Sequence, residues 1–398
     1  IQKRPRNFYG REQAMRECLE ALITFKSIAV FGDRGFGKSS LVFQLEKICN
    51  GDHEYIRQNA DELGPYVGAH IFSVATVSRI CSPDDTYESI FGELLNQLDA
   101  IYPQSEKTKW EVGFDWILQF RRTTEASGAP TSALDLFNSR LDGFAKAQAS
   151  RKKEKLQGIV VFVDEVQKLP PTVDLGGAIR KVHEQFQRGE AKGRRGLALQ
   201  LCFVVSGATD EGRLAQSDAA VRRIFKTVGL KPLSTIAICT LVRSLLTGSG
   251  VDIEQDALER VAAYATGSPA KCILLMNEVY EFDDDAMITL ADVKGGVDRF
   301  IENVRDTSVS QFIRWNQWQD METVLLHFAA QGDPGLQSET ISEAVAMTRE
   351  RVEECLLGLK TANIIEEHHF GPRRYFRFAE PKFSLYAQVK LESAVPAA

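Results

Sequence analysis

The sequence predicts an α/β protein with a parallel-sheet core, followed by a small helical domain and a C-terminal winged helix-turn-helix. Three observations predict this class. Short runs of Val, Ile and Phe alternate with helical patterns over residues 1–230, helical patterns alone fill residues 231–310, and residues 311–390 read as three helices and two strands. Continuous apolar runs fit strands buried on both faces, and strands that alternate with helices form parallel sheets.

The core accounts for the first 230 residues. Five strands are expected, at 27–31, 70–75, 159–163, 199–205 and 227–230. The helical patterns between them cover 11–25, 39–49, 86–100 and 131–148. The segment 103–154, between the second and third strands, is expected to be largely a helical insertion.

The helical domain and the winged helix follow. One helix is expected to begin at Asp252 as its N-cap and another to cover 270–280, with no strand between 233 and 304. The winged helix is expected to have helices at 317–330, 338–346 and 349–359 and strands at 364–367 and 374–378. The strands would be joined by residues 368–372, and residues 391–398 would form a tail.

Composition excludes several classes of protein. The 398 residues are 44% hydrophobic and 26% charged, the balance of an ordinary globular protein. No apolar run suits a membrane helix, no secretory signal is visible, and no two of the seven cysteines are spaced as C-x-x-C. We therefore expect a cytoplasmic or nucleoid-associated protein without a membrane partner. Because the chain begins with Ile rather than Met, we expect it to be a fragment.

The strongest motif lies directly after the first strand. Residues 32–39, Gly-Asp-Arg-Gly-Phe-Gly-Lys-Ser, match G-x-x-x-x-G-K-[ST], the phosphate-binding P-loop. Lys38 is expected to reach the β- and γ-phosphates of ATP and Ser39 to ligate Mg²⁺. The predicted nucleotide contacts here are Gly32, Arg34, Gly35, Phe36, Gly37, Lys38, Ser39 and Ser40.

A second motif lies at the end of the third expected strand. The apolar run 159–163 ends in Asp164 and Glu165. Asp164 is expected to hold Mg²⁺ and Glu165 to deprotonate the attacking water as a general base. A polar turn is the alternative reading, but the P-loop in the same chain favours catalysis.

The P-loop, the strand ending in Asp164-Glu165 and a fourth strand ending at Ser206 resemble the AAA+ ATPases. The resemblance implies that Ser206 senses the γ-phosphate and that residues 231–310 form the family's lid. It also implies an arginine finger, Arg223 rather than Arg222, that reaches the ATP of a neighbouring subunit. The alternative for these arginines is a basic pair favoured by a helix C-terminus.

Two shorter segments extend the resemblance. Gly267-Ser268-Pro269 lies where the lid carries its second sensor, but Ala270 and Lys271 follow in place of the usual arginine. Pro269 and Lys271 are therefore the candidates for a nucleotide contact there. Tyr9 and Gly10 lie in a segment that resembles the "GRE" box, which packs around adenine. A simple staple onto the first helix is the alternative.

The whole pattern resembles two neighbouring groups, the origin-recognition and archaeal initiator proteins and the STAND signalling ATPases. The resemblance implies ATP or ADP and Mg²⁺ as cofactors, ATP-dependent homo-oligomers, and a switch whose output is assembly. The output stays open between DNA and a protein partner or N-terminal effector domain. DNA contact would be electrostatic and weakly sequence-specific, through Arg373, Arg374 and Arg377. A non-catalytic scaffold is the third hypothesis, against which the Asp164-Glu165 pair argues.

Overall fold

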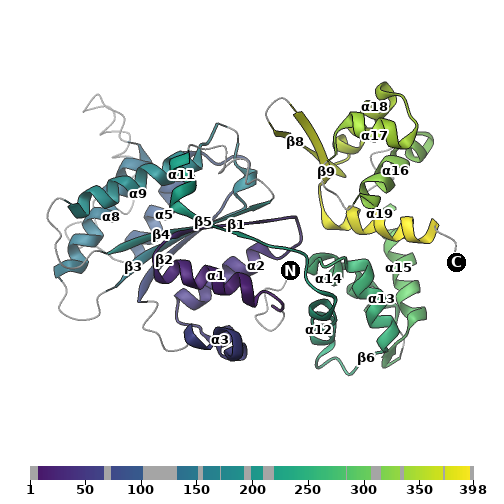
Figure 1. Cartoon of the computed structure of the whole chain (residues 1–398), viewed down its shortest axis with the longest axis horizontal. Coiled ribbons are helices and arrows are strands. Elements are labelled where there is room, and N and C mark those ends of the chain that lie inside the picture. Colours follow the sequence, from purple (N-terminus) through teal and green to yellow (C-terminus); the bar gives the residue numbers. More distant parts are fainter. Residues whose placement is uncertain are drawn as a thin grey trace.

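A five-stranded parallel sheet forms the core of the first half of the chain (Figure 1). The computed structural model describes residues 8–66, 73–101, 132–150, 156–170, 172–191, 199–208, 219–283, 285–305, 315–331, 336–370 and 373–394. The strand order is β2-β3-β4-β1-β5. The strands are β1 (Ser27–Gly32), β2 (Val74–Ile80), β3 (Gly158–Asp164), β4 (Gln200–Ala208) and β5 (Phe225–Gly229). The predicted fold class, an α/β protein with a parallel sheet, is confirmed.

The second strand begins later than the sequence predicts. Residues 70–75 were expected, but β2 runs from Val74 to Ile80, and residues 67–72 lie outside the described part of the chain. Because β2 is one of the two edge strands, its residues alternate between buried and partly exposed. An edge strand of this kind lacks the continuous apolar run that marks the central strands.

Helices cover both faces of the sheet. One face packs against α5 (Tyr87–Ile101), α8 (Ala133–Ser150) and α9 (Leu175–Ala191). The other packs against α1 (Glu12–Ile23) and α2 (Lys38–Cys49), with the short α3 (Glu54–Gln58), α4 (Ala60–Leu63) and η2 (Gly64–Tyr66) beside them. Of the expected insertion at 103–154, the part at 133–150 is α8, which packs between α5 and α9. Residues 102–131 and 151–155 lie outside the described residues.

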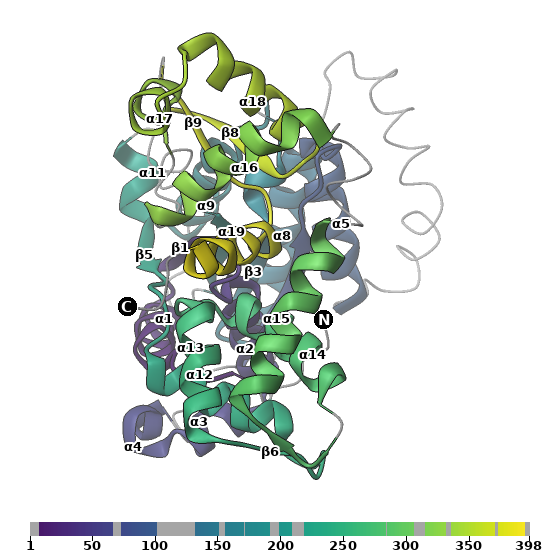
Figure 2. The same cartoon turned by 90° about the vertical axis from the view of Figure 1, so that its right-hand side faces the viewer.

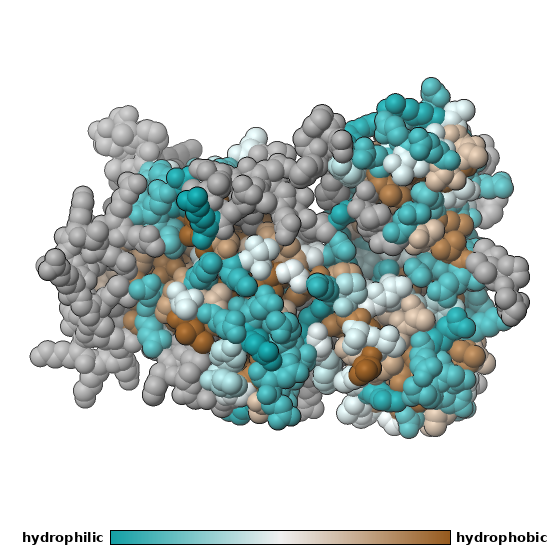
Figure 3. All heavy atoms as spheres, viewed as in Figure 1, coloured by the Kyte–Doolittle hydropathy of each residue, from teal (hydrophilic) through white to brown (hydrophobic). Residues whose placement is uncertain are grey.

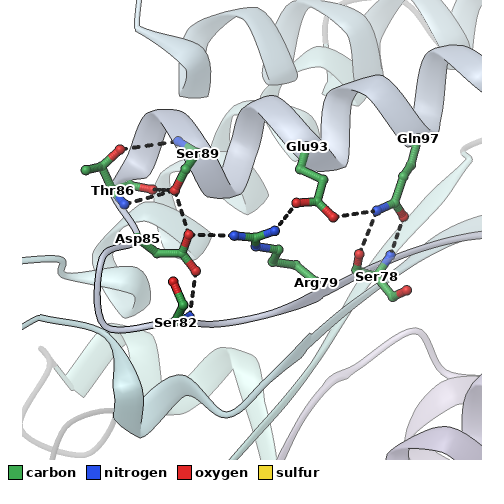
Figure 4. A network of polar contacts seen from close by, with 8 residues as sticks. All are labelled: Ser78, Arg79, Ser82, Asp85, Thr86, Ser89, Glu93 and Gln97. Carbon is green, nitrogen blue, oxygen red and sulfur yellow. Dashed lines mark hydrogen bonds and ion pairs between the residues drawn. The ribbon is translucent and has the colours of Figure 1, made fainter.

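Side chains of α5 seal the edge of β2 (Figure 4). The side-chain amide of Gln97 accepts from the Ser78 N–H at 2.8 Å and donates to the Ser78 C=O at 2.7 Å. It thereby satisfies backbone groups that a further strand would otherwise pair with. Arg79 donates to Glu93 and, at 2.6 Å, to Asp85. Asp85 is nearly buried and also accepts from Ser82 N–H and the hydroxyl of Ser89.

We expect Asp85→Ala to lower the free energy of unfolding by about 2–3 kcal/mol, because Arg79 loses its buried partner. Burial raises the pKa of Asp85, but the hydrogen bonds from Ser82, Arg79 and Ser89 outweigh it and keep the pKa below its ordinary value. The carboxylate therefore stabilises the fold above the unfolded-state pKa, and this contribution is lost as the pH falls below about 4. Urea unfolding at neutral and acidic pH measures both effects.

The exposed neighbour Asp84 provides the matched control. Asp84→Ala should leave the urea midpoint unchanged at either pH. If the two variants unfold alike, Asp85 does not fix this edge of the sheet.

The helical region at residues 231–310, called the lid from here on, contains a small element that the sequence does not predict. Its helices are α12 (Thr235–Leu246), α13 (Gln255–Ala265), α14 (Pro269–Phe282) and α15 (Leu290–Val304). Asp252 is not an N-cap: it belongs to β6 (Asp252–Ile253), which pairs in parallel with β7 (Met287–Ile288). The expectation of no strand between 233 and 304 is therefore wrong. The pairing places Ile253 and Ile288 in the core of the lid, and Asp252 accepts instead from the Ile253 N–H.

The C-terminal part has the predicted order of three helices and an antiparallel hairpin. These elements are α16 (Trp315–Ala330), α17 (Ser338–Val345), α18 (Arg349–Thr361), β8 (Ile365–Phe370) and β9 (Arg373–Phe378). His368 and His369, expected in the turn, belong to β8 and pair with Tyr375 and Arg374. A further helix, α19 (Pro381–Ala394), was not expected and takes up half of the expected tail.

Helix α19 joins the lid to the C-terminal part (Figure 2). It packs against α13, α14 and α15 of the lid and against α16. One hydrophobic core consequently runs through both regions, from Leu233 to Val389. On the face drawn in Figure 3, the hydrophobic side chains of the described residues are scattered among hydrophilic ones. No helix among the described residues has the length and apolar character needed to cross a membrane.

Candidate nucleotide site

The P-loop connects the carboxyl end of β1 to the first turn of α2. Gly37 precedes α2 with φ +87°, a left-handed conformation that favours glycine. A Cβ atom added at Gly37 would meet no atom within 4 Å, so the space beside the start of α2 is open. The unpaired N–H groups of a helix N-terminus bind anions. This space is suited to phosphate.

Lys38 folds back into the loop. Its Nζ atom donates to the carbonyl oxygens of Gly32 at 2.8 Å and Asp33 at 2.9 Å, and only 8% of the residue is exposed. Burial lowers the pKa of Lys38 to about 8, although Glu165, Asp33 and Asp164 oppose this shift. A buried cation whose hydrogen-bond partners are neutral carbonyls gains a compensating charge when phosphate arrives.

The acidic residues Asp164 and Glu165 lie at the carboxyl end of β3, which β4 separates from β1. Ser206 on β4 is fully buried, and its hydroxyl donates to Oδ1 of Asp164 at the end of β3. Oδ1 also accepts from the Glu165 N–H at 2.8 Å. The structure thus brings Asp164 and Ser206 into direct contact, at the same end of the sheet as the P-loop.

Glu165 has an unusual backbone conformation. Its φ and ψ of 60° and 35° are left-handed, which is uncommon for a residue with a side chain and costs energy. Its Oε2 atom accepts from Gln167 Nε2 at 2.7 Å and lies 3.3 Å from Lys168 Nζ, both in η3 (Val166–Lys168). Neither partner was predicted, because a residue two or three positions after an acid has no distinctive sequence signal.

A cavity of about 60 Å³ adjoins the P-loop on the lid side. It is lined by the N-terminal segment, the P-loop and the lid, through Phe8, Tyr9, Arg11, Phe36, Gly37, Ser40, Leu233, Leu241, Pro269 and Ile273. Tyr9, Phe36, Gly37, Ser40 and Pro269 were predicted nucleotide contacts. Phe8, Leu241 and Ile273 were not, because their apolar side chains look like ordinary core residues in sequence.

Arg11 ties the walls of this cavity together. It is 7% exposed and donates to the carbonyl oxygens of Lys231 at 2.6 Å and Phe36 at 2.7 Å. Burial lowers its pKa to about 10. The Tyr9 hydroxyl donates to the Ser244 hydroxyl on α12 at 3.0 Å. The segment around Gly10 is therefore fixed to both the P-loop and the lid.

The lid touches the P-loop at Gly35, whose carbonyl accepts from Ala270 N–H at 3.2 Å and the Ser268 hydroxyl at 3.3 Å. A Cβ atom at Gly35 would lie 2.9 Å from the Ala270 Cβ atom, so only glycine allows this approach. Lys271, the candidate second sensor, donates to Thr266 Oγ1 at 3.1 Å within the lid. It lines a second cavity, of about 270 Å³, together with Asp33 and Arg34.

The C-terminal hairpin also contacts the P-loop, which the sequence did not predict. Arg34, an expected nucleotide contact, donates to the Glu366 carboxylate and the Ala379 carbonyl. Arg377, an expected DNA contact, lies 3.4 Å from Asp33 Oδ1. Two oppositely oriented ion pairs therefore join the tip of the P-loop to β8 and β9. No local pattern in a single sequence announces such a long-range pairing.

The two candidate arginine fingers lie away from this site. Arg223 is exposed near the end of α11 (Ala219–Ile224), at the amino end of the sheet, whereas the P-loop lies at the carboxyl end. The side chain of Arg222 lies outside the described residues. Arg223 consequently cannot reach the P-loop of its own chain, and action on a neighbouring subunit stays a prediction.

The oxygen donors near the P-loop fit Mg²⁺. Ser39 follows Lys38 in the first turn of α2, and Asp164 offers a partly exposed carboxylate. Within the described ranges, no group of three or more His, Cys, Asp or Glu side chains could hold a metal ion. One hydroxyl and one carboxylate suit Mg²⁺ that takes its other ligands from nucleotide phosphates and water.

No family model matches the chain, and no curated protein matches it. Among solved structures it is similar to the Thermotoga maritima RuvB Holliday junction branch migration motor, at 13% identity over 94% of this chain and 95% of that chain, with a TM-score of 0.43. It is also similar to the Aeropyrum pernix ORC2 protein in ADPNP-ADP complexes, at 12% identity over 96% and 93%, with a TM-score of 0.47. It is similar to a structure of Drosophila ORC bound to DNA at 12% identity over 97% of this chain and 88% of that chain, with a TM-score of 0.40. Similarity at this level carries no argument about activity.

Proposed function

We propose that the chain is an AAA+ type ATPase that binds ATP with Mg²⁺ at the P-loop and hydrolyses it. The observation that carries this proposal is the convergence of four groups at one end of the sheet. Lys38 lies buried in the P-loop, Ser206 donates to Asp164, and Glu165 directly follows Asp164 at the end of β3. A phosphate-binding loop beside a metal-binding carboxylate and a general base is the arrangement that phosphoryl transfer to water requires.

Each residue has a defined role in the reaction. Lys38 and the N–H groups at the start of α2 bind the β- and γ-phosphates, while Ser39 and Asp164 would hold Mg²⁺, which neutralises charge on these phosphates. Glu165 takes a proton from the water whose oxygen attacks the γ-phosphorus. The bond to the β–γ bridging oxygen breaks, and ADP and phosphate leave. Ser206 positions Asp164, and an arginine of a neighbouring subunit, Arg223 or Arg222, stabilises the transition state.

The output of this ATPase is self-assembly controlled by the nucleotide. Arg223 lies too far from its own P-loop to act there, which favours a site completed between copies of the chain. DNA is the first candidate for the surface on which copies assemble, in replication, transposition or DNA-targeting defence. Three arginines of the C-terminal part form ion pairs with carboxylates, and these pairs are Arg349–Glu339, Arg351–Asp320 and Arg374–Glu353. To bind DNA, the arginines would have to leave these carboxylates and contact phosphates.

Mass photometry of the Glu165→Gln protein tests this proposal. With ATP and Mg²⁺ we expect a larger assembly than with ADP, and mixed-sequence duplex DNA should comigrate with it and be released by salt. A particle mass that is indifferent to both nucleotide and DNA would contradict assembly as the output. ATP binding measured on the same sample separates that result from failure of the nucleotide site.

A second candidate function is a STAND-type signalling ATPase that regulates a protein partner or effector domain. One observation favours it: two charged side chains of the hairpin form ion pairs with the P-loop. Arg377 faces Asp33 and Glu366 faces Arg34, so two polar groups of the hairpin are bound to the core. In this function, ATP would weaken the contact and release the C-terminal part.

Reversal of the Arg34–Glu366 pair tests the second candidate. Glu366→Arg places two guanidinium groups together, so we expect the C-terminal part to detach from the P-loop and become sensitive to protease without ATP. Adding Arg34→Glu should restore the contact and the protease resistance. Glu392→Arg, which breaks a pair with Arg260 away from the P-loop, is the matched control. Equal protease resistance in all variants would exclude a charge-controlled lock.

A further inference from the structure

A cavity of about 320 Å³ lies at the opposite end of the sheet from the P-loop. It is formed where β1, β4 and β5 begin, between the turn after α1 and the helices α9 and α11. Its lining residues are Thr24, Phe25, Lys26, His183, Phe186, Gln200, Leu201, Arg223 and Ile224. Apart from Arg223, the candidate arginine finger for a neighbouring subunit, none of these lining residues has a role proposed for the ATPase site.

The charge of the cavity is one-sided. Lys26, His183 and Arg223 are basic, and no Asp or Glu is among the lining residues that the structure describes. Lys26 and Arg223 are exposed, and among the described residues neither side chain has a hydrogen bond or an ion pair. By contrast Lys226, three residues after Arg223, lies 3.7 Å from a carboxylate oxygen of Glu17. Two cations that face one cavity without a counter-ion favour an anion between them.

The walls hold these groups in place. Phe25 has a φ of +50°, a strained conformation for an aromatic residue, and two backbone hydrogen bonds of 2.9 Å fix the turn, from Phe25 N–H to Leu22 and from Lys26 N–H to Ala21. Phe186 and Leu201 are buried and form an apolar wall beside His183. The cavity is therefore a shaped site with a basic rim.

We propose that this cavity binds a phosphate group, with Lys26 and Arg223 as its charged ligands and His183 as a hydrogen-bond donor. The planar guanidinium of Arg223 can donate two parallel hydrogen bonds to phosphate oxygens. The other charged group beside His183 is Glu184, whose carboxylate is taken by Arg180 at 2.7 Å. Burial lowers the pKa of His183, so a bound phosphate should raise it again.

Pyrophosphate titrated into the Lys38→Ala protein tests this site with the P-loop disabled. We expect saturable binding by calorimetry, and an upward shift of the His183 pKa seen in its imidazole NMR signals. Lys26→Gln with Arg223→Gln should weaken binding about tenfold or more, because both charge-assisted contacts are lost. Both side chains are exposed, so the fold should survive, which thermal unfolding checks. Lys226→Gln removes the same charge outside the cavity and should bind as the parent does.

A short oligothymidylate used in place of pyrophosphate identifies the source of the phosphate. If it binds more tightly and displaces pyrophosphate, the cavity takes the backbone of a nucleic acid. If only pyrophosphate binds, the ligand is a small phosphorylated molecule. If neither probe binds the Lys38→Ala protein, or if the double variant binds as tightly as the parent, the proposal is wrong. The outcome does not depend on the ATPase function, because Lys38 is absent throughout.

Discussion

Replacing Glu165 with Gln should lower the rate of ATP hydrolysis by about 10²–10⁴-fold, the usual contribution of a general base. The amide has nearly the shape of the carboxylate but cannot accept the proton of the attacking water. Gln167 can still donate a hydrogen bond to the amide oxygen at position 165, because this contact does not depend on a negative charge. The left-handed backbone at residue 165 stays as it is, so the effect falls on chemistry.

ATP affinity should change only a few-fold in the same variant, because the proposed phosphate ligands, Lys38 and the start of α2, are unchanged. Steady-state phosphate release and equilibrium ATP binding, measured side by side, separate the two quantities. Glu88→Gln makes the same chemical change at an exposed position of α5 and serves as the control. Hydrolysis at the parental rate in Glu165→Gln would remove this residue from the reaction.

Replacing Gly37 with Val should reduce ATP affinity about a hundredfold or more, by filling the space where phosphate oxygens meet the N–H groups of α2. The open space beside Gly37 would then hold two methyl groups. Because φ at this position is +87°, the variant should also lose about 1–2 kcal/mol of folding free energy.

Gly51 offers a matched control for this second effect. It has φ +90°, nothing lies within 4 Å of an added Cβ atom, and it sits in the turn after the other end of α2. Gly51→Val should therefore lose a similar amount of stability in thermal unfolding while ATP binding stays intact. If both variants bind ATP equally well, Gly37 does not border the phosphate site.

The central strands and the residues at their ends could be predicted because their signals are local. In β1 and β3 almost every residue is buried, so the apolar run in the sequence is the strand itself. The P-loop and the Asp164-Glu165 pair are contiguous with these runs. The positions of these motifs after their strands therefore predicted that Lys38 and Asp164 lie at one end of the sheet, and the resemblance to AAA+ ATPases added Ser206.

The elements that escaped prediction depend on contacts with distant parts of the chain. Helix α19 is buried on most sides, from Phe383 to Ala387, so it shows no apolar stripe against a polar face. The two-residue strands β6 and β7 exist only because Ile253 and Ile288 share the lid core. In the site, Arg34 was assigned to the nucleotide from its place in the motif, while its actual partners are more than 300 positions away.

The shared core around α19 has a mechanical consequence. A lid and a C-terminal part that were separate bodies could turn independently, but α19 packs on both and fastens them into one arm. That arm touches the P-loop at two places, through Ser268 and Ala270 at its base and through Glu366 and Arg377 farther out. A rotation of this arm about its contact with Gly35 would therefore also move the hairpin contacts at Asp33 and Arg34. The same stiffness means that a chain cut between the two parts would leave each with an exposed apolar face.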